Sequence, residues 1–396
     1  MIPIHSASEF ISENIVALPG EKAALSDSVG RILGEDVLAD SDLPPFDRSQ
    51  MDGYAVKASD TQNAPVELKI VGESAAGRGW HSELRNGEAV RIMTGAPVPA
   101  GADAVQKIEL TSEDGETVVI QKSVEPGKSI VRQADEVRKG DKVFAAGERI
   151  TENMIAALAS FGYASVTVAR RPTVAILSTG SEIVELEQTP GRDQIRNSNS
   201  VMIHALARKF GGSTRILPIV GDDFEKLKSS VADALGTDIM IITGGVSVGK
   251  YDLTKDALHA LGARIFFEKV RVKPGKPLVF AKLNDTLIFG LPGNPVSAAV
   301  TFYLFVRSAI LQMQGASQTS LRVGTAVVRR AVRAAKERET FLPASLVSGT
   351  GGRIFAEPLK YGGSSDFIGF SRAEALIRIP QGASLDEGDA AEIYYL

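Results

Sequence analysis

The centre of the chain alternates short, fully apolar runs with stretches that repeat apolar residues at a helical period. Five runs have the length and composition of buried strands, at residues 174–177, 214–220, 239–242, 264–267 and 286–289. Helical stretches separate them, and two of these, 201–210 and 224–235, are each followed by a glycine that favours a helix end. Strands that are apolar on both faces are typical of parallel sheets covered by helices. Residues 172–314 are therefore predicted to form an α/β domain.

The N-terminal part has a different pattern. Ser6 and Glu9 have the spacing of a capping box, and the apolar residues that follow predict a helix before Pro19. From residue 44 to about 147, short β-like runs are punctuated by Gly, Pro, Asn and Asp, which predicts a small β-rich domain. A helix returns over 151–161, with Thr151 as its N-cap and Gly162 as its stop. The β-rich part is therefore predicted to be inserted between two pieces of one helical module.

The amino-acid composition and net charge argue against some classes of binding partner and of chemistry. The 396 residues are 44% hydrophobic and 23% charged, which is typical of a soluble globular protein. A formal net charge of -4 offers no general basic surface to nucleic acid or to an anionic membrane. The absence of cysteine excludes disulfides, thiolate nucleophiles and cysteine-bound zinc. The N-terminus has no signal-peptide pattern, and the apolar run 300–311 is too short to span a bilayer, so we expect a cytoplasmic protein.

Polar loops follow four of the predicted strands, at residues 178–182, 221–223, 243–252 and 291–297. Because the carboxyl ends of parallel strands meet at one edge of a sheet, these loops are expected to converge on one ligand site. The loop 243–252 contains three glycines, which let backbone N–H groups approach an anion. Asn294 and Pro295 stand where an N-cap and the first helical residue belong, and a helix start also suits an oxyanion. Simple turns and helix caps would explain the same residues.

Charged residues near these loops indicate a phosphate and metal site. Glu182, Asp222 and Asp252 each follow a strand, and carboxylates there can hold Mg²⁺ or can cap helices. Between two of the loops, the segment 270–280 places Lys273 and Lys276 on a turn stiffened by two prolines. Such a pair can hold a dianion, although a solvated basic turn has the same composition.

Seven segments, taken in order, resemble one known family. They are PPFDRSQMDGYAV from Pro44, MTGAPVPAGADAV from Met93, LSTGSE from Leu177, QIRNSN from Gln194, TGGVSVGKYD from Thr243, VKPGKPL from Val272 and GLPGNPVS from Gly290. In these segments the chain is similar to the molybdopterin molybdenumtransferases, the MoeA and gephyrin E-domain family. The resemblance implies a helical hinge (1–43 and 148–171), an inserted β-rich domain (44–147), a three-layer α/β/α molybdopterin-binding domain (172–318) and a C-terminal β-barrel (319–396).

The family inserts molybdate into adenylylated molybdopterin and hydrolyses the adenylate to AMP, with Mg²⁺ as the usual cation. By resemblance, the substrate phosphates are assigned to Thr179, Gly244, Gly245, Ser247 and Asn294, and the cation to Asp222 and Asp252 with Glu182 in support. Molybdate is assigned to Lys273, Lys276, Ser297, Arg338 in RETFLP and Ser364 in YGGSSDF. The substrate supplies the sulfurs that bind molybdenum, so the chain needs no cysteine for this chemistry.

The resemblance also implies partners. Asp52 and Thr94 of the β-rich domain are expected to face the α/β domain of a second protomer, which implies a homodimer. Substrate would come from a molybdopterin adenylyltransferase, and product would go to apo-molybdoenzymes or their chaperones. Three alternatives stay open: an adenylyltransferase of the same pathway, insertion of tungsten, and a non-enzymatic scaffold. An adenylyltransferase would lack the Pro44 and Met93 segments and the barrel.

Three positions depart from the family pattern. They are Gln133-Ala134, where the family commonly has Arg-Gly, Lys250, where an acidic residue is frequent, and Ile368-Gly369, where a Ser-Ser pair is often found. These differences bear on affinity or metal preference and leave the phosphate loops intact.

Overall fold

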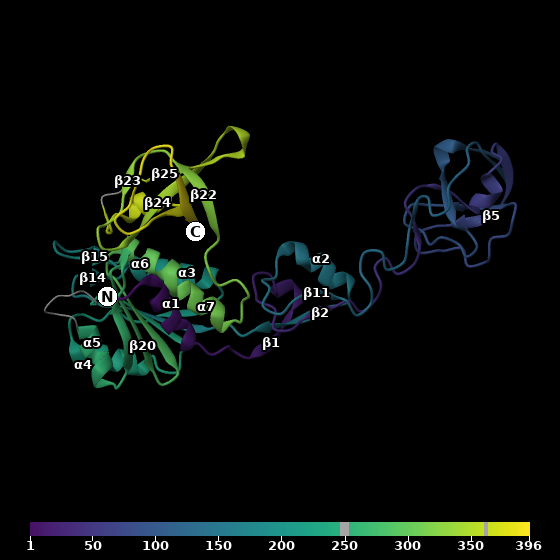
Figure 1. Cartoon of the computed structure of the whole chain (residues 1–396). Coiled ribbons are helices and arrows are strands. Elements are labelled where there is room, and N and C mark those ends of the chain that lie inside the picture. The colour runs from purple at the N-terminus through teal and green to yellow at the C-terminus, as the bar shows by residue number, and fades with distance from the viewer. Residues whose placement is uncertain (246–252, 360–362) are drawn as a thin grey trace. The chain divides into compact units, whose positions relative to one another are not determined.

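The computed structural model describes residues 1–245, 253–359 and 363–396. It consists of two compact units (Figure 1). The main unit comprises Met1–Glu35, Ala146–Glu152 and Ser165–Leu396, and the β-rich unit comprises Asp36–Ala145 and Asn153–Ala164. The β-rich unit is thus inserted into the main unit, whereas the boundaries of the four expected domains stay a prediction.

A six-stranded sheet forms the centre of the main unit, in the order β16-β13-β17-β21-β20-β18. Its strands are β13 Thr173–Ser178, β16 Ser213–Ile216, β17 Ile239–Thr243, β18 Arg264–Lys269, β20 Pro277–Leu283 and β21 Thr286–Leu291. Strands β16, β13, β17 and β21 run parallel, as predicted. Strand β20 is antiparallel to both β21 and β18, and it was missed because 270–280 was interpreted as a rigid turn. The predicted strand 214–220 ends early, at Ile216.

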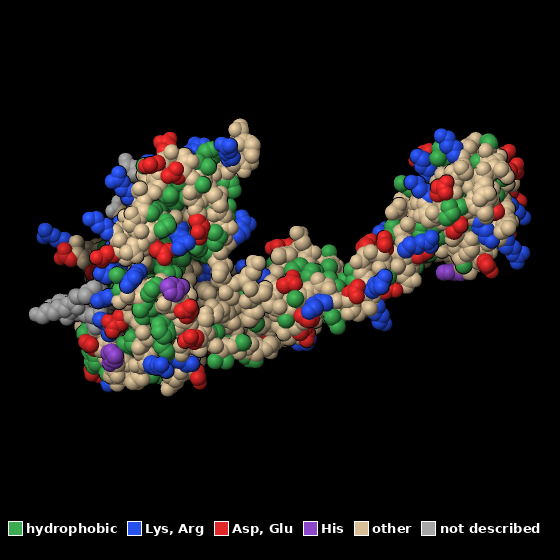
Figure 2. Space-filling model, in the orientation of Figure 1, with side chains coloured by type: hydrophobic (Ala, Val, Ile, Leu, Met, Phe, Trp, Pro, Cys, Tyr) green, Lys and Arg blue, Asp and Glu red, His purple; other side chains and the backbone are tan. Residues whose placement is uncertain are grey.

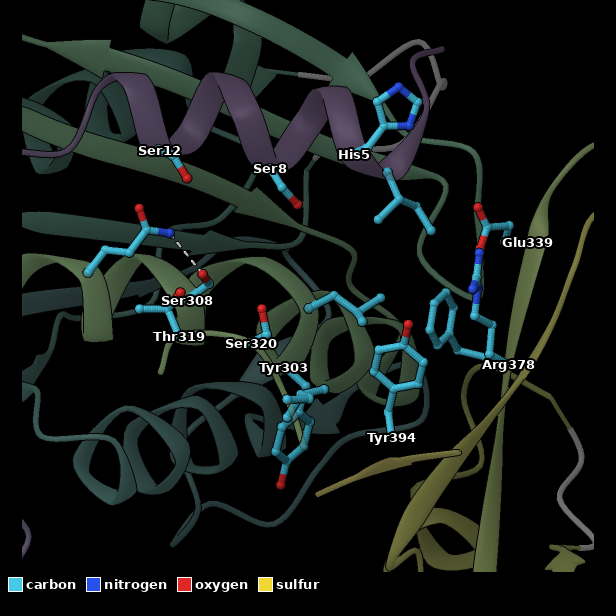
Figure 3. A pocket seen from close by; sticks show the side chains of 15 residues that line it. His5, Ser8, Ser12, Tyr303, Ser308, Thr319, Ser320, Glu339, Arg378 and Tyr394 are labelled. Carbon is cyan, nitrogen blue, oxygen red and sulfur yellow. Dashed lines mark hydrogen bonds and ion pairs between the residues drawn. The ribbon is translucent and has the colours of Figure 1, made fainter. Parts of the chain in front are cut away.

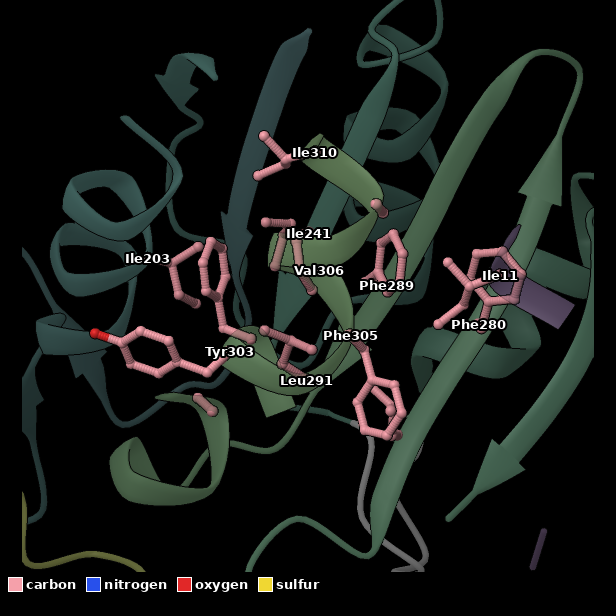
Figure 4. Close-up of a cluster of buried hydrophobic side chains, with 14 of the residues drawn as sticks. Ile11, Ile203, Ile241, Phe280, Phe289, Leu291, Tyr303, Phe305, Val306 and Ile310 are labelled. Atoms are coloured by element: carbon pink, nitrogen blue, oxygen red, sulfur yellow. The ribbon is translucent and has the colours of Figure 1, made fainter. Parts of the chain in front are cut away.

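Helices cover both faces of this sheet, so the α/β/α layers that the family resemblance implied are confirmed. Side chains of β17 alternate between two cores: Ile239 and Ile241 face one, and Met240 and Ile242 face the other. The first core, partly drawn in Figure 4, packs against α1, α3 and the long helix that begins at Pro295. The second packs against α4 and α5. The helices are α1 Ile4–Glu13, α3 Ser198–Lys209, α4 Phe224–Asp233 and α5 Leu253–Ala260.

The long helix comprises α6 Pro295–Thr301, the π-helical turn η4 Phe302–Val306 and α7 Arg307–Met313. It is longer than the apolar run 300–311 suggested, and its 19 residues have the length and composition that could cross a membrane. Of its most apolar window, however, 78% is buried inside the protein, as in the core helix of a globular domain. Acidic and basic side chains are interspersed on the face shown in Figure 2.

The N-terminal helix corrects the predicted capping box. Helix α1 begins at Ile4, directly after Pro3, so Ser6 lies inside its first turn and caps nothing. The helix also ends at Glu13, before the apolar residues that were expected to extend it. Further on, β1 Gly20–Ala24 pairs with β12 Ser165–Ala169. The helix predicted at 151–161 is confirmed as α2 Glu152–Ser160.

A closed five-stranded barrel ends the chain, as predicted. Its strands are β22 Val323–Val328, β24 Glu339–Ser348, β25 Ile354–Pro358, β26 Ala375–Ile379 and β28 Ala390–Tyr395, and the pairing of β24 with β26 closes it. The short strand β19 Val272–Lys273, from the α/β part, extends the barrel by pairing with β24. The barrel also has β23 Val332–Arg333, β27 Ser384–Leu385 and the short helix α8 Phe367–Phe370. The two domains of the main unit are therefore joined by backbone pairing.

The β-rich unit is built on a six-stranded sheet in the order β7-β4-β6-β5-β9-β8. Its strands are β4 Gly53–Val56, β5 Val66–Ser74, β6 Glu88–Ile92, β7 Ala104–Lys107, β8 Thr111–Asp114 and β9 Thr117–Ile120. Two small pairs complete it: β3 Arg48–Ser49 with β10 Ile130–Val131, and β2 Val37–Leu38 with β11 Lys142–Phe144. The β-rich texture predicted from residue 44 onward is confirmed.

Candidate functional site

A cavity of about 910 Å³ lies at the carboxyl edge of the central sheet, where β13, β17 and β21 end. Loops from all three strand ends line it. Six residues that the sequence placed in the site are among them: Thr179, Glu182, Asp222, Gly244, Gly245 and Asn294. The convergence of these loops follows from the topology of the sheet. Ser247 and Asp252 lie outside the described residues.

The two described glycines of the Gly-rich loop stand against the end of β13. Gly244 has a φ of +93°, and a side-chain carbon there would lie 2.3 Å from the carbonyl oxygen of Thr179. A carbon on Gly245 would lie 2.8 Å from the hydroxyls of both Thr179 and Thr254. Those two hydroxyls are buried without a hydrogen-bond partner in the described part of the chain. Only glycine permits this close packing of the loop on the two hydroxyls.

Two asparagines of the segment 194–199 also line the cavity, although neither was predicted to have a role. Asn197 caps α3 by accepting a hydrogen bond from the Ser200 N–H at 3.2 Å. Asn199 donates from Nδ2 to Thr243 Oγ1 at 2.9 Å and to the Gly293 carbonyl at 2.7 Å. Asn199 therefore ties the Gly-rich loop to the loop before α6. The polar sequence of this segment was a signal that could have identified it.

The start of α6 corrects one detail of the prediction. Asn294 occupies the N-cap position, but its side chain makes no cap and donates instead to Ser364 Oγ at 2.8 Å. The Ser364 carbonyl in turn accepts from the Val296 N–H at 3.0 Å. A segment of the barrel therefore satisfies the helix start, and from the same segment Ser365 and Phe367 line the cavity.

The carboxylates predicted to bind a metal stand at the cavity wall. Glu182 and Asp222 are both exposed, and Asp222 accepts a 2.6 Å hydrogen bond from Ser181 Oγ. Asp222 does not cap α4, because Asp223 does so through the Lys226 N–H. Among the residues that the structure describes, no group of three or more histidine or acidic side chains is arranged to hold a metal ion. The described part of the site offers two carboxylates.

Of the residues predicted to bind molybdate, Ser364 is hydrogen-bonded to the cavity residue Asn294, and the others belong to β19, the turn after it, α6 and the residue before β24. Lys273 is the last residue of β19 and pairs with Thr340 of β24. Arg338 lies two residues before Thr340 in the sequence. The turn after it packs on α6, because a side-chain carbon on Gly275 would lie 2.4 Å from the Thr301 methyl group and 3.5 Å from the Ser297 carbonyl oxygen. Lys273, Lys276, Ser297 and Arg338 are all described, and none of them lines the cavity, whereas the next residue, Pro277, does.

Asp52 and Thr94 are brought together within the β-rich unit. Asp52 Oδ1 accepts from the Thr94 N–H at 2.7 Å and from its hydroxyl at 2.9 Å. The backbone bond, and then the hydroxyl bond, lower the pKa of the Asp52 carboxyl. Both residues are exposed, so this ionised carboxylate can face another surface.

A second cavity, of about 410 Å³, lies between α1, the long helix and the barrel (Figure 3). Hydroxyl side chains such as Ser8, Ser308 and Tyr394 line it, together with the ion pair between Arg378 and Glu339. Burial, aided by Glu392, raises the pKa of Tyr394 to about 12. Among the residues that the structure describes, none of those assigned to the site lines this cavity, so we place the candidate site at the first one.

An α/β domain with ligand loops at its strand ends, joined to a barrel and carrying an inserted β-rich unit, defines a multidomain ligand-binding protein. Family models match it throughout: the MoeA N-terminal region (domain I and II) at residues 2–162, a probable molybdopterin binding domain at 175–312, and the MoeA C-terminal region (domain IV) at 325–396. The chain belongs to the MoeA family.

Relatives agree over nearly the whole length. The chain is 37% identical to the molybdopterin molybdenumtransferase of Bacillus subtilis (strain 168), with 91% of this chain and 86% of the relative covered. It is 34% identical to that of Staphylococcus aureus (strain COL), with 99% and 97% covered. The crystal structure of the molybdopterin biosynthesis moeA protein from Pyrococcus horikoshii OT3 matches with a TM-score of 0.87 at 28% identity, over 100% of both chains.

Proposed function

We propose that this protein is a molybdenum insertase of molybdenum-cofactor biosynthesis. Its substrates are molybdate and adenylylated molybdopterin, and its products are molybdenum cofactor and AMP. The observation that carries the proposal is the strand-end cavity, in which Gly244 and Gly245 bring backbone close to the Thr179 hydroxyl, which has no hydrogen-bond partner among the described residues. Such a surface suits the phosphates of an adenylylated substrate. The relatives named molybdopterin molybdenumtransferase support the same reaction.

The substrate phosphates would be bound by the loops that follow β13, β17 and β21. The Thr179 hydroxyl, the Asn294 side chain and the backbone of Gly244 and Gly245 would hold the phosphate oxygens. Glu182 and Asp222 offer oxygen ligands on the same wall, which fits Mg²⁺ in donor type, although two carboxylates alone make a weak site. When bound there, Mg²⁺ would neutralise phosphate charge during attack on the adenylate.

Molybdate would be bound by what we call the cationic side of the site, which consists of Lys273 and Lys276 of the segment 270–280 and Arg338 before β24. Lys273, Lys276 and Arg338 would provide positive charge, and arginine can donate two N–H groups to one oxyanion. Ser297 and Ser364 would supply hydroxyls near the start of α6. These side chains position the molybdate next to the phosphate cavity, and the chain supplies orientation and electrostatic stabilisation.

We further propose that the protein acts as a homodimer in the cytoplasm, with Asp52 and Thr94 completing the site of the second protomer. It would receive its substrate from a molybdopterin adenylyltransferase and deliver product to apo-molybdoenzymes or their chaperones. Mixed dimers of Asp52→Ala and Arg338→Ala test the shared site. In a heterodimer of the two variants, both substitutions fall in one of the two shared sites, and the other site has wild-type Asp52 and Arg338. Mixing should therefore restore activity that both single variants lack. Failure to restore activity in a mixture that forms heterodimers contradicts the shared site.

The direct test is reconstitution. Purified protein, adenylylated molybdopterin, Mg²⁺ and molybdate should release AMP and activate a cofactor-free molybdoenzyme. Omitting molybdate provides the control for insertion, and replacing it with tungstate measures metal preference. If the protein instead forms pyrophosphate from ATP and molybdopterin, it is an adenylyltransferase. Absence of both AMP and activation contradicts the proposed function.

A further inference from the structure

Two large apolar side chains on the wall of the strand-end cavity are left exposed to solvent. Ile195 of β15 (Ile195–Arg196) is 59% exposed, and Phe367 of α8 is 47% exposed. The polar functions assigned to this cavity, which are phosphate and metal binding, use neither of them. Exposed apolar surface inside a ligand cavity is typical of the part that a ligand covers.

The position of Phe367 on this wall is held by hydrogen bonds on its N-terminal side. Asp366 accepts from the Gly369 N–H at 2.9 Å and so caps α8. Two residues earlier, Ser364 is bound to Asn294 and to the Val296 N–H at the start of α6. The Phe367 ring therefore belongs to a segment whose first residue, Ser364, is hydrogen-bonded at the start of α6, and whose short helix α8 is capped by Asp366.

We propose that Phe367, with Ile195, binds a planar fused nitrogen heterocycle of the substrate. This inference rests on the proposed function, because adenylylated molybdopterin has two such ring systems, the pterin and the adenine. An aromatic face is a suitable partner for either ring, since stacking combines burial of apolar surface with favourable ring electrostatics. Phe367 would be a residue contributed by the barrel that binds and positions substrate in the α/β cavity.

Phe367→Ala should weaken binding about tenfold, with a range of about 5- to 100-fold for the loss of one stacked ring. The titrants are AMP for the adenine and metal-free molybdopterin for the pterin, each measured by calorimetry with wild-type protein and variant. Weakening with AMP alone assigns the adenine, and weakening with molybdopterin alone assigns the pterin. Ile368→Ala is the matched control, because Ile368 is the next residue of α8, is 70% exposed and is not on the cavity wall.

A fluorescent variant tests contact directly. The chain has one tryptophan, Trp80, and its indole N–H has no hydrogen-bond partner in the described part of the chain, so Trp80→Phe removes no such bond. In that background, Phe367→Trp should keep affinity within a few-fold of wild type, and ligand stacking should quench its emission.

Unchanged affinity of Phe367→Ala for both titrants would overturn the inference, and so would an equal loss in Ile368→Ala. Emission of Phe367→Trp that does not respond to saturating ligand would also overturn it. These results are separate from failure of the proposed function, which wild-type protein reports by lacking AMP release. If wild-type protein releases AMP and Phe367→Ala binds both titrants as wild type does, only the stacking role of Phe367 is rejected.

Discussion

The two sides of the candidate site differ in what holds them in place. The phosphate side is made by loops at the ends of three neighbouring strands, β13, β17 and β21. The cationic side, with Lys273 and Arg338, depends on a short pairing between the α/β part and the barrel. The geometry of the phosphate side is determined within one sheet, whereas the geometry of the cationic side requires the α/β part and the barrel to dock.

This difference has a consequence for mutation. Changes on the phosphate side should disturb the fold of the sheet edge together with binding, because Gly244 is in close contact with the backbone of β13's end. Changes on the cationic side should alter oxyanion binding alone, because the pairing that holds Lys273, and that begins directly after Arg338, is made by backbone groups.

The largest effect is expected for Gly244→Ala. Its new carbon would lie 2.3 Å from the Thr179 carbonyl oxygen at a φ of +93°, so we expect a loss of about 3 kcal/mol of stability together with loss of AMP binding. Calorimetric unfolding of the main unit measures it. Gly236→Ala is the matched control, since it has a φ of +94° but no atom within 4 Å, and should cost about 1 kcal/mol. Equal losses in the two variants would contradict the close approach.

The next effect tests the cationic side. Lys273→Ala should raise the KM for molybdate about tenfold, because a charge-assisted contact to the oxyanion is lost. Its affinity for AMP and its unfolding midpoint should stay as in wild type. Lys282→Ala, on the same β20 strand as Pro277 but at the end away from the cavity, is the control. A parallel loss of AMP affinity in Lys273→Ala would show that the two sides are one binding surface.

The sequence predicted the phosphate side well for a physical reason. Fully apolar runs identify buried parallel strands, and their carboxyl ends must converge, so the sequence alone predicts that Thr179, Gly244 and Asn294 lie close together. The α/β domain was predicted from the same pattern, whereas the three layers and the C-terminal barrel were implied by the family resemblance. Strand β20 was missed because the prolines of 270–280 indicated a turn, while its residues pair as the antiparallel neighbour of β21.

The parts that could not be predicted depend on contacts between distant segments. Nothing local shows that Asn294 bonds Ser364 in place of capping its own helix. The capping box at Ser6 failed because Pro3 starts the helix earlier. Phe367 reaches the cavity only through the fold, so its residue type gave no cue to a role, whereas Asn199 lies in a polar segment that could have indicated one.

Asp238 lies directly before β17, at the end of the sheet opposite the phosphate side, and tests what holds the sheet together there. Burial tends to raise the pKa of Asp238, but hydrogen bonds from Arg170 and Thr173 outweigh it and lower the pKa. A lowered pKa stabilises the fold above the unfolded value near 4, and this contribution is lost as the pH falls through the folded value. Asp238→Asn should therefore cost about 2 kcal/mol at pH 7 and progressively less below about pH 4. A difference that does not change with pH, seen in unfolding at pH 7 and pH 3, would contradict the ionised pair.

The smallest effect addresses the link between the two sides. Asn294→Ala and Ser364→Ala each remove the 2.8 Å hydrogen bond that joins the start of α6 to the barrel segment. In a double-mutant cycle on unfolding, the coupling should be about 1 kcal/mol, the usual size for one hydrogen bond between neighbours. The backbone bond from Val296 to the Ser364 carbonyl persists in all three variants, so the cycle isolates the side chains. A coupling near zero would mean that the β19–β24 pairing docks the barrel without help from this contact.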